Sequence, residues 1–326
     1  MSEADAAAQA SVEARAAGDL AGAVAHAQRC LELRQAALGE RHADTAAAYG
    51  LVGAAQRRRG ALAEALAADR RALEIFKDVL GDSHADTATA RGNLSATQRA
   101  RGEHGQALEL AEAALAGLQA ACGADDLRTA MAWGNLAAVR RARGENQEAI
   151  DCGLELVRIR QAVLGDMHSD TADARSTLGA LRAASGDHRG AAREEEMVLA
   201  ARTAAGDQRR KLEALGNLAT IHRNLGDAAV SLEFQKQALQ IQRTLLGETD
   251  AATTRSRLFI AYTLVRVGRQ AEALRVLDEG LRHCPGHEGL SQLKQQVEQV
   301  AQPGFRTPAQ QASTARAKGR PRGRKR

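Results

Sequence analysis

The chain has 326 residues, of which 44% are hydrophobic, only 2% are aromatic and four are proline. This composition favours helices and argues against a β-sheet fold, because strands prefer aromatic and β-branched residues. The formal net charge of +5 is misleading, since residues 303–326 contain eight basic residues and no acid. The rest of the chain carries a slight excess of acid, which excludes a strongly basic, nucleic-acid-binding body.

The N-terminal end of the chain shows no targeting signal. Residues 1–5 are acidic and lack the hydrophobic core of a secretory signal. No apolar stretch approaches the roughly 18 residues that would cross a bilayer. The cysteines are widely spaced and form no C-x-x-C motif; they are Cys30, Cys122, Cys152 and Cys284. We therefore expect a cytoplasmic protein with reduced cysteines and no membrane insertion.

One glycine recurs along the chain at intervals of 42 residues, with a single interval of 40. Its positions are Gly18, Gly60, Gly102, Gly144, Gly186, Gly226 and Gly268. A small residue stands seven residues before each glycine and another stands five residues after it, which lets two helices approach closely. Glycine also permits the positive φ that a tight turn requires. We therefore predict that each unit consists of a helix A, a turn at this glycine and a helix B.

A second motif marks the junctions between units. It reads Leu-Gly-Asp/Glu-x-His-x-Asp-Thr at residues 38–45, 80–87 and 164–171, with degenerate copies at 122–129 and 246–253. Its glycine indicates the end of helix B. We expect the aspartate to accept hydrogen bonds from the free amides of the next helix A, at Asp44, Asp86 and Asp170. No third or fourth ligand recurs beside the His-x-Asp pair, so we predict no metal site. Around Gly206 the motif is missing.

These residues resemble the 42-residue tetratricopeptide repeats of kinesin light chain. The likeness is clearest in Trp-Gly-Asn-Leu-Ala at residues 133–137, Gly144, and the junction at 164–168, and it covers residues 4–285. It implies an all-α, right-handed superhelical solenoid of about seven helix pairs. The sequence departs from the family at the aromatic position four residues before the glycine, so the packing there must differ. That position holds Gln56, Gln98, Arg140, Arg182 and His222.

The last part of the chain divides into a helix and a tail. Leu290, Leu293, Val297 and Val300 form one apolar stripe within residues 288–301, which predicts a helix that caps the last repeat. The sequence after Pro303 has no apolar periodicity and is expected to be disordered. We therefore expect a repeat array at 1–287, a capping helix at 288–302 and a disordered basic tail at 303–326.

The resemblance also suggests which residues line the concave wall formed by the A helices. Asparagine stands nine residues before the glycine at Asn93, Asn135 and Asn217. A side-chain amide both donates and accepts hydrogen bonds, so it can hold an extended peptide backbone. The alternative is that these asparagines only bridge neighbouring helices.

Arginine forms a second row, three residues before the glycine. Its members are Arg57, Arg99, Arg141 and Arg223. Guanidinium groups suit carboxylates or phosphates, while the alternatives are a solvated rim or ion pairs with a neighbouring helix. Glycines ten residues before the turn lie near the same face, and either let a ligand approach the backbone or serve helix packing. They are Gly50, Gly92, Gly134 and Gly216.

The tail is a dense cationic segment with Lys318, Arg320, Arg322, Arg324, Lys325 and Arg326. It could attract nucleic-acid phosphates, act as a nuclear address, contact acidic membranes or fold back on the array; the alternative is an inert extension.

No nucleotide-binding, hydrolase or metalloprotease motif occurs, so we predict no enzyme and no cofactor. The leading prediction is a scaffold that binds an extended, acidic peptide of a protein partner. The alternative is a nucleic-acid-associated adaptor that uses the tail.

Overall fold

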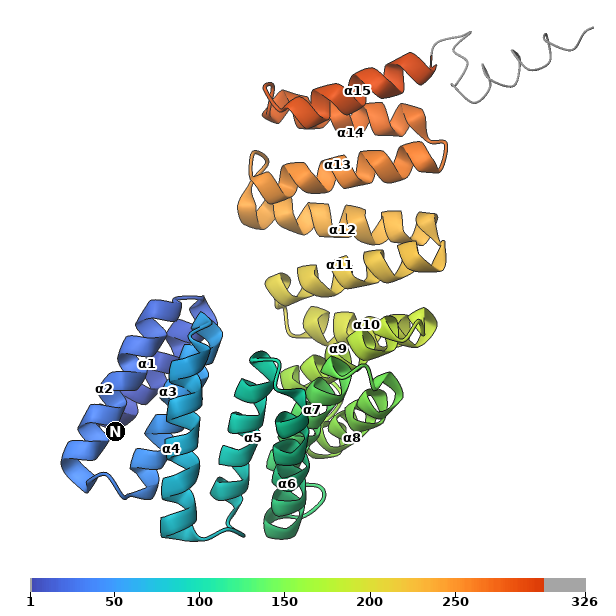
Figure 1. Cartoon of the computed structure of the whole chain (residues 1–326). Helices are drawn as coiled ribbons and strands as arrows, with labels where there is room; N and C mark the ends of the chain where they lie inside the picture. The colour runs from blue at the N-terminus through green and yellow to red at the C-terminus, as the bar shows by residue number, and fades with distance from the viewer. Residues whose placement is uncertain (1, 302–326) are drawn as a thin grey trace, which may run out of the picture. The chain divides into compact units, whose positions relative to one another are not determined.

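The computed structural model describes residues 2–301 and contains fifteen helices and, within that range, no strand (Figure 1). The prediction of an all-α fold is confirmed, and the first fourteen helices follow one another as seven A and B pairs. The described residues form two compact units, residues 2–201 and 202–301, and their boundary lies close to Gly206, where the junction motif is missing. None of the described helices is both long and apolar enough to cross a membrane.

The first unit contains α1 to α9 and the greater part of α10. Their bounds are α1 Glu3–Ala17, α2 Leu20–Leu38, α3 Ala43–Arg59, α4 Leu62–Leu80, α5 Ala85–Ala100, α6 His104–Cys122, α7 Leu127–Ala142, α8 Asn146–Leu164, α9 Ser169–Ala184 and α10 His188–Ala204. The second unit contains α11 Gln208–Leu225, α12 Ala228–Leu246, α13 Ala251–Arg266, α14 Gln270–His283 and α15 Glu288–Ala301.

The recurring glycine ends each A helix, as predicted. Its φ lies between 78° and 89° in all seven repeats, a region that other residues adopt only under strain. The residue after the glycine donates back into the helix, as Asp19 does to the carbonyl of Ala14 at 2.9 Å. This bond satisfies a free carbonyl at the helix end.

Small residues on both sides of the turn bring the two helices of a pair into contact. The residue five positions after the glycine is at most 1% exposed in all seven repeats. Ser11 Oγ donates to the carbonyl of Ala23 at 2.7 Å, and Ser95 Oγ donates to that of Ala107 at 2.6 Å. These hydrogen bonds join the two predicted small positions and fix how the helices pack.

Histidine, not the predicted aspartate, caps three of the A helices. The Nδ1 atom of this histidine accepts from the backbone N–H two residues later at 3.1 Å, at His42, His84 and His168. In two degenerate junctions Asp126 and Asp250 take the same place and accept at 2.8 Å.

The predicted capping residues lie instead in the first helical turn; they are Asp44, Asp86 and Asp170. Negative charge is favourable there because the helix N-terminus is partly positive. The prediction of aspartate as the cap was wrong because this aspartate, although a common capping residue, already lies inside the helix, and the imidazole two residues earlier stands at the N-cap.

A recurring contact ties four of the described junctions to the next A helix. The acidic residue after the junction glycine pairs with a buried arginine nine residues later, in Asp82–Arg91, Asp166–Arg175 and Glu248–Arg257. In the first repeat Tyr49 donates to Glu40 at 2.8 Å. The third junction has Ala124 instead of an acid, and Trp133 takes the place of the arginine and packs against the core. The acid and its partner are thus absent together.

Polar and aromatic contacts occupy the position where the family has an aromatic residue, as expected from the sequence. Gln98 Nε2 donates to Gln106 Oε1 at 2.9 Å, and Arg140 pairs with Glu112 at 2.9 Å. In the second unit the His222 ring lies 5.5 Å from that of Phe234. Gln98 and His222 therefore contact helix B of their own pair, whereas Arg140 on α7 contacts Glu112 on α6, which is helix B of the preceding pair.

The core of the second unit extends into α15. Leu290, Leu293 and Val297 are at most 3% exposed and pack in one cluster with Leu264 and Leu277. The side chain of the fourth stripe residue, Val300, lies outside the described part of the chain.

Candidate peptide-binding groove

Hollows lie between successive A helices in the described part of the first unit. The first, of about 340 Å³, lies between α3 and α5, with Asp69, Ala72 and Phe76 of α4 behind it. The second, of about 150 Å³, lies between α5 and α7, and the third, of about 370 Å³, lies between α7 and α9. Asn93 lines the first two, Asn135 lines the second, and Arg141 lines the third.

The two asparagines predicted to line the groove of the first unit have free side-chain amides. Asn93 and Asn135 are half-buried, and neither amide makes a hydrogen bond to another residue in the described chain. The alternative that they bridge neighbouring helices by hydrogen bonds is therefore not supported. Both amides retain two donors and an acceptor for a ligand.

The glycines ten residues before the turn make room for these asparagines. A Cβ atom on Gly92 would lie 3.2 Å from Asn135 Nδ2, and one on Gly50 would lie 3.7 Å from Asn93 Nδ2. The glycine of one repeat thus accommodates the asparagine of the next. At Gly134 the neighbour is instead Leu156, 3.4 Å from the same position. Here the missing side chain serves helix packing.

Arg57 is tied into the fold more tightly than the other predicted arginines. Its Nη1 donates to Thr97 Oγ1 at 2.9 Å and to the carbonyl of Asn93 at 3.2 Å, and lies 3.5 Å from Asp69. The Thr97 hydroxyl in turn donates to Asp69 Oδ2 at 2.6 Å. Asp69 is fully buried, and burial raises its pKa to about 6. This carboxylate compensates the charge of Arg57.

The arginines of successive repeats act on one another electrostatically. Burial, followed by the positive charges of Arg99 and Arg15, lowers the pKa of Arg57, while Asp69 opposes these effects. Burial and the charge of Arg141 lower the pKa of Arg99. The charges of Arg57 and Arg99, and those of Arg99 and Arg141, thus influence each other, while the role of these residues in ligand binding stays a prediction. Arg15, which stands three residues before Gly18, acts on Arg57 in the same way and was not among the predicted residues.

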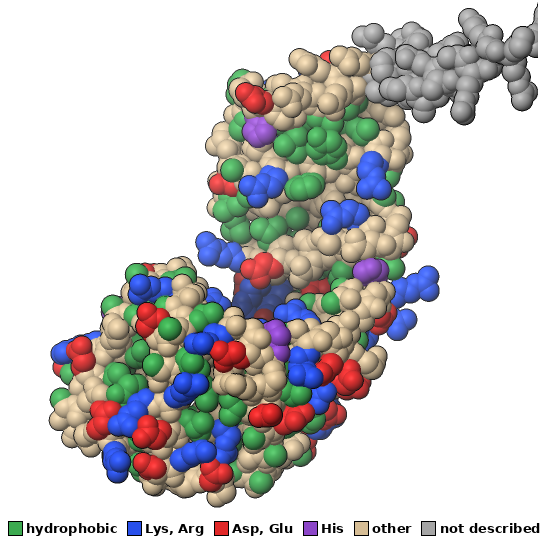
Figure 2. Space-filling model, viewed as in Figure 1, with side chains coloured by type: hydrophobic (Ala, Val, Ile, Leu, Met, Phe, Trp, Pro, Cys, Tyr) green, Lys and Arg blue, Asp and Glu red, His purple; other side chains and the backbone are tan. Residues whose placement is uncertain are grey.

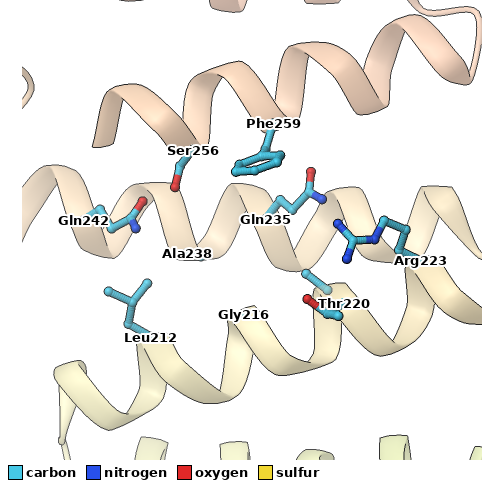
Figure 3. Close-up of a pocket in the computed structure, with 10 residues that line it drawn as sticks. Leu212, Gly216, Thr220, Arg223, Gln235, Ala238, Gln242, Ser256 and Phe259 are labelled. Carbon is cyan, nitrogen blue, oxygen red and sulfur yellow. The ribbon is translucent and has the colours of Figure 1, made fainter. Parts of the chain in front are cut away.

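The remaining two predicted residues belong to the second unit, where both are exposed. Arg223 lines a hollow of about 420 Å³ between α11 and α13, whereas Asn217 does not line it. Figure 3 shows the residues around this hollow, among them Phe259 from α13, Gln235 and Gln242 from α12, and Leu212 from α11. Phe259 stands nine residues before its glycine, in the place that Asn93 and Asn135 take in the first unit.

The surfaces of the two units differ accordingly. On the face shown in Figure 2, side chains of both charges are interspersed over the first unit, and hydrophobic side chains gather over α12 to α14 of the second. The predicted basic tail lies outside the described residues, so its role stays a prediction.

One cluster in the second unit resembles a set of metal ligands. Glu248, Glu279 and His283 bring their ligand atoms within 4.8 Å of one another. However, Glu248 pairs with Arg243 at 2.7 Å and also with Arg257, and Arg243 pairs with Glu279 at 3.2 Å. Because arginines already compensate these carboxylates, we assign no metal to the cluster.

The helix pairs and the hollows between their A helices define an α-helical repeat protein. A family model for the tetratricopeptide repeat matches residues 3–78, 57–120, 128–204 and 210–285, most of the chain. The chain therefore belongs to the tetratricopeptide repeat family, whose members are generally non-catalytic scaffolds for protein–protein interaction. No curated protein matches the sequence.

Solved structures share this fold at low sequence identity. BtubC (BKLC) from P. vanneervenii is 19% identical with a TM-score of 0.60, covering 70% of this chain and 92% of its own. A putative kinesin light chain repeat protein from Podosopora anserina is 20% identical with a TM-score of 0.54, covering 62% and 95%. The apo form of RapI is 11% identical with a TM-score of 0.65, covering 91% and 85%. The predicted likeness to kinesin light chain repeats is thus confirmed for the fold.

Proposed function

We propose that the chain is a cytoplasmic interaction scaffold whose first unit binds an extended, acidic peptide of a protein partner along its A helices. The observation that carries this proposal is the pair of unpartnered amides at Asn93 and Asn135. They stand one repeat apart, beside hollows that are lined mainly by small or apolar residues. An extended peptide offers backbone donors and acceptors at regular intervals, so two such amides can bind it independently of its sequence.

The arginine row gives the groove its preference for acidic peptides. Arg99 and Arg141 form no ion pair within residues 2–301. Unpaired guanidinium groups bind carboxylates through two parallel hydrogen bonds, and they repel basic segments. Charge thereby adds selectivity to the sequence-independent binding by the asparagines. The same repulsion disfavours the chain's own basic tail as an occupant of this groove.

Binding to an array of extended peptides tests this function. Asn93→Ala combined with Asn135→Ala should weaken every bound peptide at least about tenfold, because it removes the backbone contacts of two repeats. Arg99→Glu combined with Arg141→Glu should weaken acidic peptides selectively. The control is Arg70→Glu with Arg193→Glu, which makes the same charge change at exposed positions on B helices. Unchanged affinities in both groove variants would refute the proposal.

The charge distribution of the sequence favours a second candidate. Eight of the 45 basic residues stand in residues 303–326, without any acid among them. A nucleic-acid-associated adaptor, with access to the nucleus through this segment, would retain nucleic acid with a strong dependence on salt. Filter binding of the full chain and of a chain ending at residue 302 separates the candidates. Equal retention of both proteins at every salt concentration would eliminate the adaptor.

A further inference from the structure

The C-terminal ends of α5 and α7 carry more arginines than acids. Arg101 pairs with Glu103 at 2.8 Å. Glu145 pairs with Arg143 at 2.6 Å and with Arg140 at 3.2 Å. The two carboxylates next to the turns, those of Glu103 and Glu145, therefore already form ion pairs with other arginines. The arginines three residues before each glycine, Arg99 and Arg141, have no acidic partner in the described chain.

The two unpaired arginines stand on neighbouring A helices. They hold equivalent positions in successive repeats, and α5 and α7 contact each other directly. Packed helices lie about 8–10 Å apart, a distance that two arginine side chains can close. The half-buried Arg99 is disfavoured in its charged form first by burial and then by Arg141. Two like charges held in this way attract an anion that neutralises both.

The preceding arginine of the row, Arg57, adds little to the charge of this pair. Arg57 has the buried carboxylate of Asp69 at 3.5 Å and hydrogen bonds to α5, so its charge is largely compensated. Of the arginines on α3, α5 and α7 in this row, Arg99 and Arg141 are thus the two without a compensating acid in the described part of the chain.

We propose that Arg99 and Arg141 together bind a phosphomonoester dianion, carried by a phosphorylated side chain of the bound peptide. A phosphate group carries a charge of about −1.5 to −2 at neutral pH and has three acceptor oxygens, enough for two guanidinium groups. A single carboxylate can compensate only one of the two charges. The inference rests on the proposed function of the same groove and specifies the chemical group of the peptide that the groove recognises. It predicts that phosphorylation of the partner increases binding.

Small anions give a first test on the full chain. Inorganic phosphate should raise the melting temperature in a saturable way, and more than acetate or chloride at equal ionic strength, because it binds the folded state. Phosphate also stabilises proteins non-specifically, so the comparison needs the variants Arg99→Gln, Arg141→Gln and the control Arg70→Gln. The saturable part should disappear in the first two variants and persist in the control. The proposal would be overturned if none of the three variants lost the saturable stabilisation by phosphate, or if all three variants lost it.

Peptides provide the second test and separate this inference from the proposed function. An eight-residue extended peptide is synthesised with serine, glutamate or phosphoserine at one central position, and binding to the full chain is titrated by calorimetry. The phosphoserine peptide should bind at least about tenfold tighter than the glutamate peptide, and Arg99→Gln should abolish this difference. Equal affinity for phosphoserine and glutamate would refute the phosphate site but leave an acidic-peptide scaffold. Affinity for none of the peptides would refute both.

Lipid or free phosphate could supply the same chemical group. Vesicles that contain a phosphomonoester lipid and soluble glycerol phosphate are therefore titrated in parallel. Tighter binding to either one than to the phosphoserine peptide would overturn the assignment to a protein partner. We expect the peptide to bind more tightly, because the amides of Asn93 and Asn135 add backbone contacts that lipid and glycerol phosphate lack.

Discussion

The carboxylate of Asp69 on α4 occupies the space into which a side chain on Gly53 of α3 would project. Asp69 is fully buried; one oxygen accepts from Thr97, and the other has no partner in the described chain. Glycine at the small position of this repeat thus makes room for a buried acid. The acid in turn holds Arg57 of the candidate groove.

The stability of the protein should depend on pH through Asp69. Its pKa of about 6 in the folded state lies above the value of about 3.9 in an unfolded chain. The unfolded state therefore releases this proton first, and the free energy of unfolding falls as pH rises from about 4 to about 6. Above about pH 7, where Asp69 is ionised in both states, this contribution no longer changes. Two pKa units correspond to about 3 kcal/mol.

Asp69→Asn should remove this dependence. Urea unfolding of both proteins at several pH values between 4 and 7 measures it, and the variant should gain stability relative to the natural chain as pH rises. A difference in unfolding free energy that stays constant over this range would contradict the raised pKa. Asp173→Asn, at an acid in the third hollow, serves as the control.

Gly53→Ala should destabilise the protein by about 1–3 kcal/mol, since the added methyl group must displace a buried carboxylate. The loss should be largely recovered when Asp69→Ala is introduced as well. The equivalent positions of the next repeat, Ser95 and Ala111, show that small residues can face each other there. A double-mutant cycle by urea unfolding measures the coupling. Additive effects of the two substitutions would argue against the steric relationship.

Three glycine-to-alanine substitutions should separate helix stability from peptide binding. Gly216→Ala and Gly50→Ala should each stabilise the protein by up to about 1 kcal/mol, because alanine favours the helix and the space is free or sufficient. Gly92→Ala should gain less stability than the other two variants, because its methyl group must shift the Asn135 amide. For the same reason it should weaken peptide binding several-fold. Thermal unfolding and peptide titration measure the two effects. Equal binding by all three variants would show that the position of Asn135 is unimportant.

The capping histidines should be replaceable by aspartate but not by alanine. His84→Ala should cost about 1 kcal/mol, because the amide of Asp86 loses its acceptor. His84→Asp should retain the cap, as Asp126 does naturally in the following junction. Urea unfolding compares the two variants. A similar loss in both would mean that the imidazole contributes by packing and not by its hydrogen bond.

The helix pairs could be predicted because the repeat shows them directly in the sequence. A glycine every 42 residues, between small residues, is sufficient to place a turn between two closely packed helices. The capping atom could not be predicted in the same way, since histidine and aspartate both stand at the junction and only the backbone geometry decides between them.

The candidate groove was predicted less completely than the fold. The rows of asparagine and arginine follow from their spacing, but the compensation of Arg57 does not, because Asp69 stands on a B helix twelve residues further on. The sequence also gives no sign that Asn93 and Asn135 belong to one compact unit and Asn217 to another. The only indication is the missing junction motif around Gly206.

After the third junction Trp133 stands at the position that holds a buried arginine after three other junctions, and this difference has a practical consequence. Trp133 is the only tryptophan of the chain, and it packs against the core of the first unit. Indole fluorescence therefore reports the melting of residues 1–201 alone, whereas far-ultraviolet circular dichroism reports helix throughout the chain. If the two signals change at different denaturant concentrations, the halves of this protein unfold independently.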